Sequence, residues 1–109
     1  MFAEVKAGMM IKGSAYDVQI RQQIYAAVKD LTATADIDLP GTVSISIDPV
    51  TGAVTDNSTL TDAYAITAIT AWCLLHIGNP PNNKELLDSY NTIKGNMSRS
   101  SAYSNFSAE

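Results

Sequence analysis

The sequence predicts a mainly α-helical fold: a small three- to four-helix bundle with an inserted β-hairpin or long loop and a C-terminal arm. Two segments repeat apolar residues at helical spacing, a third is apolar on almost every side, and one short stretch alternates apolar and polar residues. With 109 residues, 46% of them hydrophobic and 17% charged, the chain has the length and composition of one folded domain. We place that domain at residues 1–97 and the arm at residues 98–109.

The first predicted helix covers residues 15–34 and follows a lead-in, residues 1–13, which we expect to be an arm or irregular. Ser14, with Asp17 three positions later, resembles a capping box in which Asp replaces Glu. The apolar stripe of this helix consists of Ile20, Ile24, Val28 and Leu31. Its spacing is that of a helix with one face packed on a core.

A β-hairpin or long ordered loop is predicted at about residues 42–56. Val43, Ile45 and Ile47 alternate with polar residues, which is the pattern of a half-buried strand. The turn-forming residues Asp48-Pro49 and Thr51-Gly52 follow, and residues 53–55 can form a short returning strand.

The second predicted helix covers residues 62–77, with Thr61 as its N-cap. Its sequence, DAYAITAITAWCLLHI, is apolar on almost every side, so we expect a helix that is buried all round. The run is shorter than the roughly 20 apolar residues that a membrane span needs. Gly78 can terminate the helix in a left-handed conformation, and Pro80-Pro81 prevent its continuation.

The third predicted helix begins at Asn82 or Asn83 and extends to about Met97. Because the preceding loop is short, we expect this helix to lie antiparallel to the second. Residues 98–109 are rich in serine and have no apolar periodicity. The apolar stripe of the third helix consists of Leu86, Tyr90, Ile93 and Met97.

The formal charge of −4 and the pI of about 4.7 argue against a protein that binds DNA by neutralising phosphates. The seven basic residues are scattered along the chain, and the first helix offers only Arg21 and Lys29. A small phage or bacterial DNA-binding regulatory protein remains the alternative function. The N-terminal segment lacks the pattern of a secretory signal, so we expect a protein made in the cytosol.

No catalytic, cofactor or metal motif is recognisable, and we expect neither an enzyme nor a cofactor-binding protein. Cys73 is the single cysteine and His76 the single histidine, so neither a disulfide nor a histidine cluster can form within the chain. The two residues are three positions apart, which leaves a thiol nucleophile with a histidine base as a further alternative. The apolar neighbours of Cys73 favour a buried core cysteine.

Together the segments resemble a known family. A helix of the type AYDVQIRQQIYAAVKDL precedes a β-containing stretch, which is followed by DAYAITAITAWCLLHIGNPPNNKELLDSYNTIKGNMSRSSAYS. The run into HIGNP, the LLDSYNTIKGNMS helix and the polar SSAY stretch are similar to the head–tail connector (adaptor or head-completion) proteins of long-tailed bacteriophages. The resemblance covers about residues 13–105.

This resemblance implies a virion protein, made in the host cytoplasm, that forms a homo-oligomeric ring, commonly of twelve subunits, at the phage neck. Such a ring binds beneath the portal protein, extends the DNA channel without specific DNA binding, and offers a docking surface to the next neck or tail-completion protein. The implied portal contacts are Ser98, Arg99, Tyr103 and Phe106. The implied contacts with the next ring or the channel are Asp48, Pro49, Val50, Thr51 and Gly52.

Overall fold

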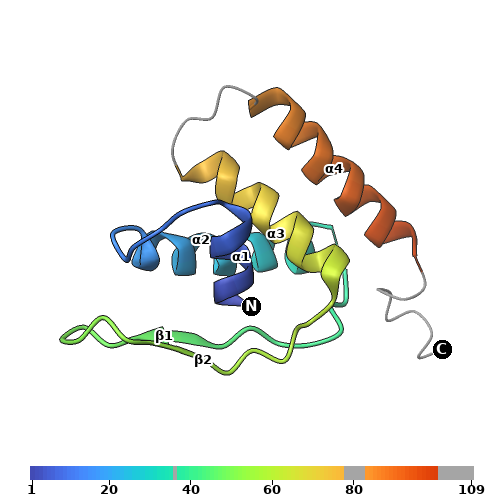
Figure 1. Ribbon diagram of the computed structural model, residues 1–109. Coiled ribbons are helices and arrows are strands. Elements are labelled where there is room, and N and C mark those ends of the chain that lie inside the picture. Colours follow the sequence, from blue (N-terminus) through green and yellow to red (C-terminus); the bar gives the residue numbers. More distant parts are fainter. Residues whose placement is uncertain (36, 78–82, 101–109) are drawn as a thin grey trace.

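The computed structural model describes residues 1–35, 37–77 and 83–100, and these form a mainly helical domain (Figure 1). The described part contains two antiparallel strands, β1 (Ile45–Ile47) and β2 (Val54–Asp56), and four α-helices: α1 (Phe2–Gly8), α2 (Asp17–Lys29), α3 (Ala63–His76) and α4 (Asn83–Arg99). Helix α3 contacts α1, α2 and α4, while the hairpin extends along one side of the bundle (Figure 1). The predicted helical bundle with an inserted β-hairpin is confirmed.

The N-terminal lead-in was expected to be irregular, and this prediction was wrong, because residues 2–8 form helix α1. Phe2, Val5 and Met9 are buried in the core, at a spacing that fits one helical face. An isolated helix of this length is unstable in water. Helix α1 therefore depends on its packing against α3, which the local sequence does not reveal.

The predicted helix at residues 15–34 exists as α2 followed by a π-helical segment, Asp30–Thr34. The expected capping by Ser14 was wrong: the helix begins at Asp17, after Tyr16, without a side-chain cap. The Asp17 carboxylate instead accepts a hydrogen bond from Lys6 Nζ at 2.7 Å. This ion pair joins α2 to α1, and such a distant partner lies outside any local capping pattern.

The hairpin pairs Ile45 with Asp56 and Ile47 with Val54, which confirms the prediction of two short strands. Its base is held against α2 by Tyr25, whose hydroxyl accepts a hydrogen bond from Ile45 N at 3.0 Å. Before β1 and after β2 the chain passes close to itself at Gly41, where an added Cβ would lie 2.6 Å from Leu60 Cα. Only glycine fits at that crossing without a backbone shift.

Helix α3 begins one residue later than expected, because Asp62 rather than Thr61 is its N-cap and accepts a hydrogen bond from Ala65 N at 3.0 Å. Helix α4 lies antiparallel to α3, as predicted (Figure 1). Its first residue is Asn83; the expected terminators Gly78 and Pro80-Pro81 lie outside the described residues.

Helix α4 is fixed to the π-helical segment by Tyr90, which is only 2% exposed. Its hydroxyl donates a hydrogen bond to Asp30 Oδ2 at 2.5 Å, and Lys94 Nζ donates to the same oxygen at 3.2 Å. Burial, followed by the hydrogen bond to the Asp30 carboxylate, raises the pKa of Tyr90. These surroundings favour the neutral hydroxyl of Tyr90, which acts as a hydrogen-bond donor.

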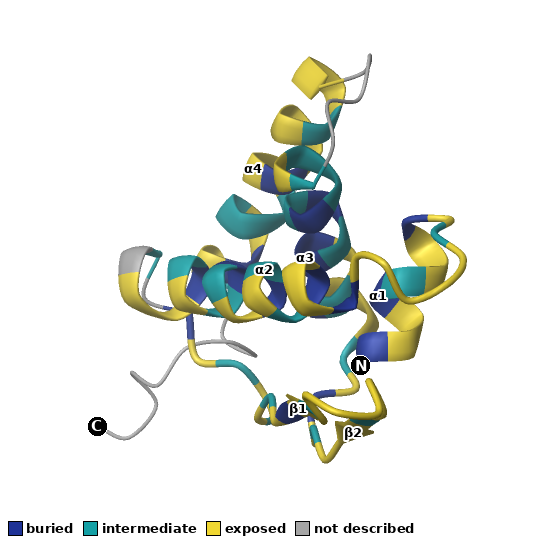
Figure 2. Ribbon diagram, turned by 90° about the vertical axis from the view of Figure 1, so that its left-hand side faces the viewer, coloured by how far each residue is buried: buried dark blue, intermediate teal, exposed yellow. Residues whose placement is uncertain are grey.

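The expectation that the second helix is buried all round was wrong (Figure 2). Ala65, Ala68 and Ile69 are fully buried, whereas Ile66 and Leu74 are partly exposed. Helix α1 is half as long as α3 and covers only part of the side of α3 that carries Ile66 and Leu74. A strip of apolar surface on α3 is left open.

Candidate functional site

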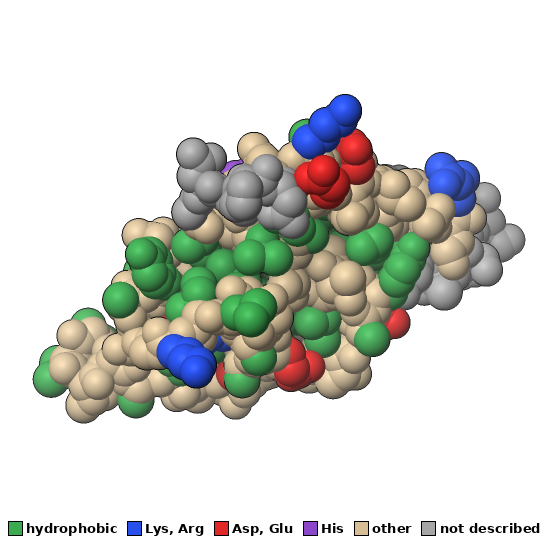
Figure 3. Space-filling view, turned by 45° about the horizontal axis from the view of Figure 1, so that its top comes forward, with side chains coloured by type: hydrophobic (Ala, Val, Ile, Leu, Met, Phe, Trp, Pro, Cys, Tyr) green, Lys and Arg blue, Asp and Glu red, His purple; other side chains and the backbone are tan. Residues whose placement is uncertain are grey.

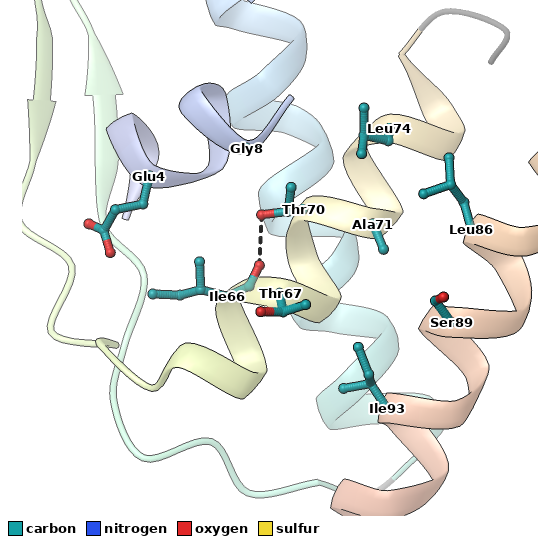
Figure 4. A pocket seen from close by; sticks show the side chains of 10 residues that line it. All are labelled: Glu4, Gly8, Ile66, Thr67, Thr70, Ala71, Leu74, Leu86, Ser89 and Ile93. Carbon is teal, nitrogen blue, oxygen red and sulfur yellow. Dashed lines mark hydrogen bonds between the residues drawn. The ribbon is translucent and has the colours of Figure 1, made fainter. Parts of the chain in front are cut away.

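The open strip of α3 forms the floor of an apolar groove whose walls are α1 and α4 (Figure 4). The groove encloses about 440 Å³, within the size range of ligand pockets. Helix α1 contributes one wall and α4 the other, so the groove brings the N-terminal helix together with the two consecutive helices α3 and α4. The lining residues are Glu4, Gly8, Ile66, Thr67, Thr70, Ala71, Leu74, Leu86, Ser89 and Ile93.

The two threonines on the floor contribute little polarity. The Thr67 hydroxyl donates a hydrogen bond to Ala63 O at 2.8 Å. The Thr70 hydroxyl donates to Ile66 O at 2.8 Å, the bond drawn in Figure 4. Both donors are therefore satisfied by their own helix. What the groove offers to a partner is mainly aliphatic surface rather than a set of free hydrogen-bonding groups.

The α1 wall lies directly against α3 at Gly8. A Cβ added at Gly8 would lie 2.9 Å from Thr70 Cγ2, closer than side chains normally approach. Because Gly8 has no side chain, the end of α1 can lie close to α3. The position of this wall relative to the floor of the groove therefore depends on glycine at position 8.

The other end of α1 is anchored by Asp56 at the end of β2. Asp56 Oδ2 accepts a hydrogen bond from Phe2 N at 2.7 Å and lies 3.1 Å from the N-terminal ammonium group. Partial burial opposes ionisation of Asp56, but hydrogen bonds from Ser58, Phe2 and the N-terminus outweigh it and hold its pKa well below the usual range. The charged carboxylate thus positions one wall of the groove.

The predicted contact residues Asp48 to Gly52 lie together at the tip of the hairpin. The Asp48 carboxylate accepts hydrogen bonds from Val50 N at 2.7 Å and Thr51 N at 3.1 Å, and these backbone donors lower its pKa. Gly52 has φ of +74°, a conformation that favours glycine. The turn holds the Val50 side chain outward, where it is 90% exposed.

A second hollow, of about 390 Å³, separates this tip from the start of α2. Arg21 lines it, and its buried Nε atom has no hydrogen-bond partner among the described residues. Val18, on the same face of α2, is 50% exposed. The remaining lining residues are Ser14, Asp17, Ile47, Asp48, Pro49 and Gly52.

The predicted portal contacts divide at the end of α4. Ser98 and Arg99 belong to its last turn, because the helix continues two residues past the expected end at Met97. The Ser98 hydroxyl donates to Gly95 O at 2.9 Å, and Arg99 Nη2 donates to Asn96 Oδ1 at 2.8 Å. Tyr103 and Phe106 lie outside the described residues. The end of α4 and the hairpin tip lie at opposite ends of the molecule (Figure 1).

The thiol alternative gains no support from the surroundings of Cys73. The cysteine is fully buried, and burial raises the pKa of its thiol to about 12. His76 is exposed, stacks on Trp72 with ring centroids 4.2 Å apart, and its Nδ1 lies 2.8 Å from Trp72 O. Burial of Cys73 agrees with the core position expected from its apolar neighbours.

Neither a membrane span nor a metal site emerges from the described part of the chain. No helix there is long and apolar enough to cross a membrane. The same residues contain no group of three His, Cys, Asp or Glu side chains that could bind a metal ion. The groove and the α2–hairpin hollow are two of the hollows on the described surface.

The chain matches no protein-family model, and comparisons with curated proteins and with solved structures find no significant similarity. The assignment of the candidate surfaces therefore rests on the residues of this chain alone. The groove residues escaped the sequence-based reasoning, although one signal was present: α3 carries more apolar residues than a small bundle can cover. Arg21 gave no comparable signal, since its missing partner is visible only in three dimensions.

Proposed function

We propose that this protein is a structural subunit of a ring at the neck of a bacteriophage virion, between the portal and the tail. The proposal combines the resemblance of residues 13–105 to head–tail connector proteins with the shape of the domain. In that setting the ring extends the DNA channel, binds the portal protein and provides a docking surface for the next neck or tail component.

The observation that carries the proposal is the presence of two unlike apolar surfaces on one small domain. One is the groove between α1, α3 and α4, and the other is the face of α2 beside the hairpin tip. Two different surfaces that bind each other form head-to-tail contacts, which close into a ring when the rotation between copies allows it. A single self-complementary surface would instead end at a dimer.

The charge of the chain suits a channel through which DNA passes. With a formal charge of −4, the ring would hold DNA weakly and let it pass, whereas tight binding needs clustered basic residues. Among the basic residues of the described helices, Lys6 and Lys94 are already paired with Asp17 and Asp30. The DNA-binding alternative therefore gains little support from the fold.

In the proposed ring, Ser98, Arg99, Tyr103 and Phe106 contact the portal, and the aromatic residues are the anchors amid polar neighbours. The hairpin tip, with Val50 projecting, contacts the next ring or lines the channel. The end of α4, with Ser98 and Arg99, and the hairpin tip lie at opposite ends of the described domain, which supports a connector with a portal side and a tail side.

The test is binding to the portal ring encoded by the same genome, measured by co-sedimentation and by cryo-electron microscopy of the complex. We expect the full chain to bind and a chain ending at Ser100 to lose binding while keeping its helical circular dichroism. The paired substitution Tyr103→Ser with Phe106→Ser should act like the truncation, and Val50→Ser, a matched control at the other end, should leave portal binding intact.

Undiminished binding by the truncated chain would show that the arm is not the portal contact. A full chain that ignores the portal ring yet shifts DNA in a salt-sensitive, sequence-specific manner would replace the connector proposal with the DNA-binding alternative.

A further inference from the structure

The apolar groove lies beside the helix from which the C-terminal arm continues. The distal arm, residues 101–109, lies outside the described residues. We propose that the distal arm folds back along α4 and docks in the groove of its own chain, with Tyr103 against Ile93 and Phe106 against Leu86. The docked arm is withheld from other partners, a consequence that rests on the proposed function, whereas the docking itself does not.

The chain leaves α4 on the side that faces the groove. Leu86 and Ile93, seven positions apart, both line the groove, and Ser100 follows Ile93 at the same interval. Residues at this interval lie on nearly the same side of a helix, because they are separated by almost two full turns. Ser100 N donates a hydrogen bond to Met97 O at 3.1 Å, which holds the end of the helix. The distal arm therefore starts in line with the α4 wall of the groove.

Apolar surface extends from the groove toward this end of α4. Tyr64 lies one turn before Thr67 on α3 and is 38% exposed. Its hydroxyl accepts a hydrogen bond from Asn96 Nδ2 at 2.9 Å, which joins the start of α3 to the last turns of α4. Figure 3 shows hydrophobic side chains gathered across the face that carries the groove. A segment that starts at Ser100 thus meets the Tyr64 ring before it reaches the groove.

The length of the distal arm matches the length of the α4 wall. A helix rises about 1.5 Å per residue, which places Ile93 about 10 Å and Leu86 about 21 Å from Ser100 along α4. An extended chain advances about 3.3 Å per residue, so Tyr103 reaches about 10 Å and Phe106 about 20 Å from the same point. Each aromatic side chain of the distal arm therefore arrives beside one aliphatic residue of the wall.

The composition of the distal arm also suits the groove. The groove offers aliphatic surface, and its edge is of mixed charge: Glu4 is paired with the N-terminal ammonium group, and Lys84 is adjacent to Glu85. Such a site favours an apolar segment with little charge. Glu109 is the only charged residue of the distal arm, whose two aromatic residues are flanked by serine, alanine and asparagine. Two large aromatic side chains are effective anchors in an apolar groove.

Covalent attachment favours the distal arm over an occupant from a second copy. A segment that is tethered by a short linker has an effective concentration in the millimolar range at its site. At micromolar protein concentrations, a segment from another copy competes poorly with it. In the proposed ring, binding of the distal arm to the portal would also uncover the groove, which couples portal contact to exposure of this apolar surface.

Methyl NMR spectra of the full chain test the docking. The methyl resonances of Leu86 and Ile93 should lie upfield, because a nearby aromatic ring shifts them, and should move downfield on deletion of residues 101–109. The paired substitution Tyr103→Ser with Phe106→Ser should have the same effect. The methyl resonances of Val50, at the hairpin tip, should not move. Leu86 and Ile93 resonances that are unchanged by the deletion would overturn the proposal.

Adjacent leucines on α4 provide a matched pair of variants. Leu86 lines the groove, whereas Leu87 is 48% exposed and is not among the lining residues. Leu86→Ser should at least halve the arm-dependent shift at Ile93, because tenfold weaker docking lowers a docked fraction of about 90% to about 50%. Leu87→Ser should leave that shift unchanged. Circular dichroism verifies that both variants fold, and equal effects of the two substitutions would contradict docking in the groove.

A mixture of isotope-labelled and unlabelled chains identifies which copy supplies the distal arm. Contacts between its aromatic rings and the Leu86 methyl groups should be observed within one chain. Contacts that occur only between labelled and unlabelled chains would assign the groove to the arm of a second copy and would overturn docking in the same chain.

Portal binding separates this proposal from the proposed function. Leu86→Ser should strengthen portal binding by up to about tenfold relative to Leu87→Ser, because the distal arm no longer has to leave the groove first. Equal portal binding by the two variants would show that the docked arm is not withheld. Docking in a chain that ignores the portal would count against the proposed function alone, and portal binding without docking would count against this proposal alone.

Discussion

The two faces of α3 are both apolar, yet they have different surroundings. Ile69 is fully buried in the core, while Ile66, on the neighbouring strip of the helix surface, is partly exposed in the groove. The difference arises because α2 and α4 pack against α3 on its core side, whereas over the groove α1 and the edge of α4 leave part of α3 uncovered. A helix with more apolar surface than the bundle around it covers has surface available for a further segment or another chain.

The largest expected effect comes from the core face. Ile69→Ala should lower the free energy of unfolding by about 2–5 kcal/mol, through lost apolar burial and the cavity left behind. Urea unfolding followed by circular dichroism would measure it. A loss below about 1 kcal/mol would mean that this face is not the core of the bundle.

The matched substitution on the groove face, Ile66→Ala, sharpens the comparison. Because Ile66 is already partly exposed, its truncation should cost about 1 kcal/mol or less in stability. Docking of the distal arm, in contrast, should weaken about tenfold, the effect of losing roughly 1.4 kcal/mol of contact energy. Methyl NMR spectra and urea unfolding of the same samples separate the two effects. Equal destabilisation by Ile66→Ala and Ile69→Ala would place the groove within the core.

The sequence identified the secondary structure more fully than the surface. Periodicity predicted α2, the hairpin, α3 and α4, because each carries a local apolar pattern. Helix α1 was missed, since its stability depends on packing against α3. The capping role expected for Asp17 failed for a similar reason: its carboxylate pairs with Lys6 on another helix.

The candidate site was largely beyond sequence reasoning. The groove needs the relative positions of three helices, and the hydropathy of α3 indicates excess apolar surface without showing which side is open. The hairpin tip was predictable, because turn residues between two strands mark it locally. The missing partner of Arg21 is a property of three-dimensional packing, which no residue pattern along the chain can express.

A smaller effect on stability is expected at α1, which forms one wall of the groove. Asp56 holds the start of α1, and folding lowers the pKa of its carboxyl group from the ordinary value of 3.8. Because the folded pKa is depressed, its stabilisation is present above that value and is lost as the pH falls through it toward the lower folded pKa. We expect α1 to lose about 1–2 kcal/mol of local stability on acidification below about pH 4.

Amide hydrogen exchange as a function of pH, corrected for the intrinsic rate, would follow this loss in α1 relative to α2. Asp56→Asn should remove much of the pH dependence of α1 in this range and weaken docking of the distal arm at neutral pH. If α1 and α2 lose protection together on acidification, Asp56 acts on the whole fold rather than on the groove wall.

The smallest effect is expected at the hairpin tip, where neither face of α3 contributes. Asp48 accepts hydrogen bonds from Val50 N and Thr51 N, and these local contacts hold the turn that presents Val50. Asp48→Ala should speed hydrogen exchange at both amides and leave the urea midpoint of the bundle unchanged. Asp48→Asn keeps a side-chain acceptor and should retain much of the protection. A fall in global stability with Asp48→Ala would show that the tip and the core are one cooperative unit. A purely local change would instead mean that the tip can vary in sequence with its partner while α3 maintains the fold.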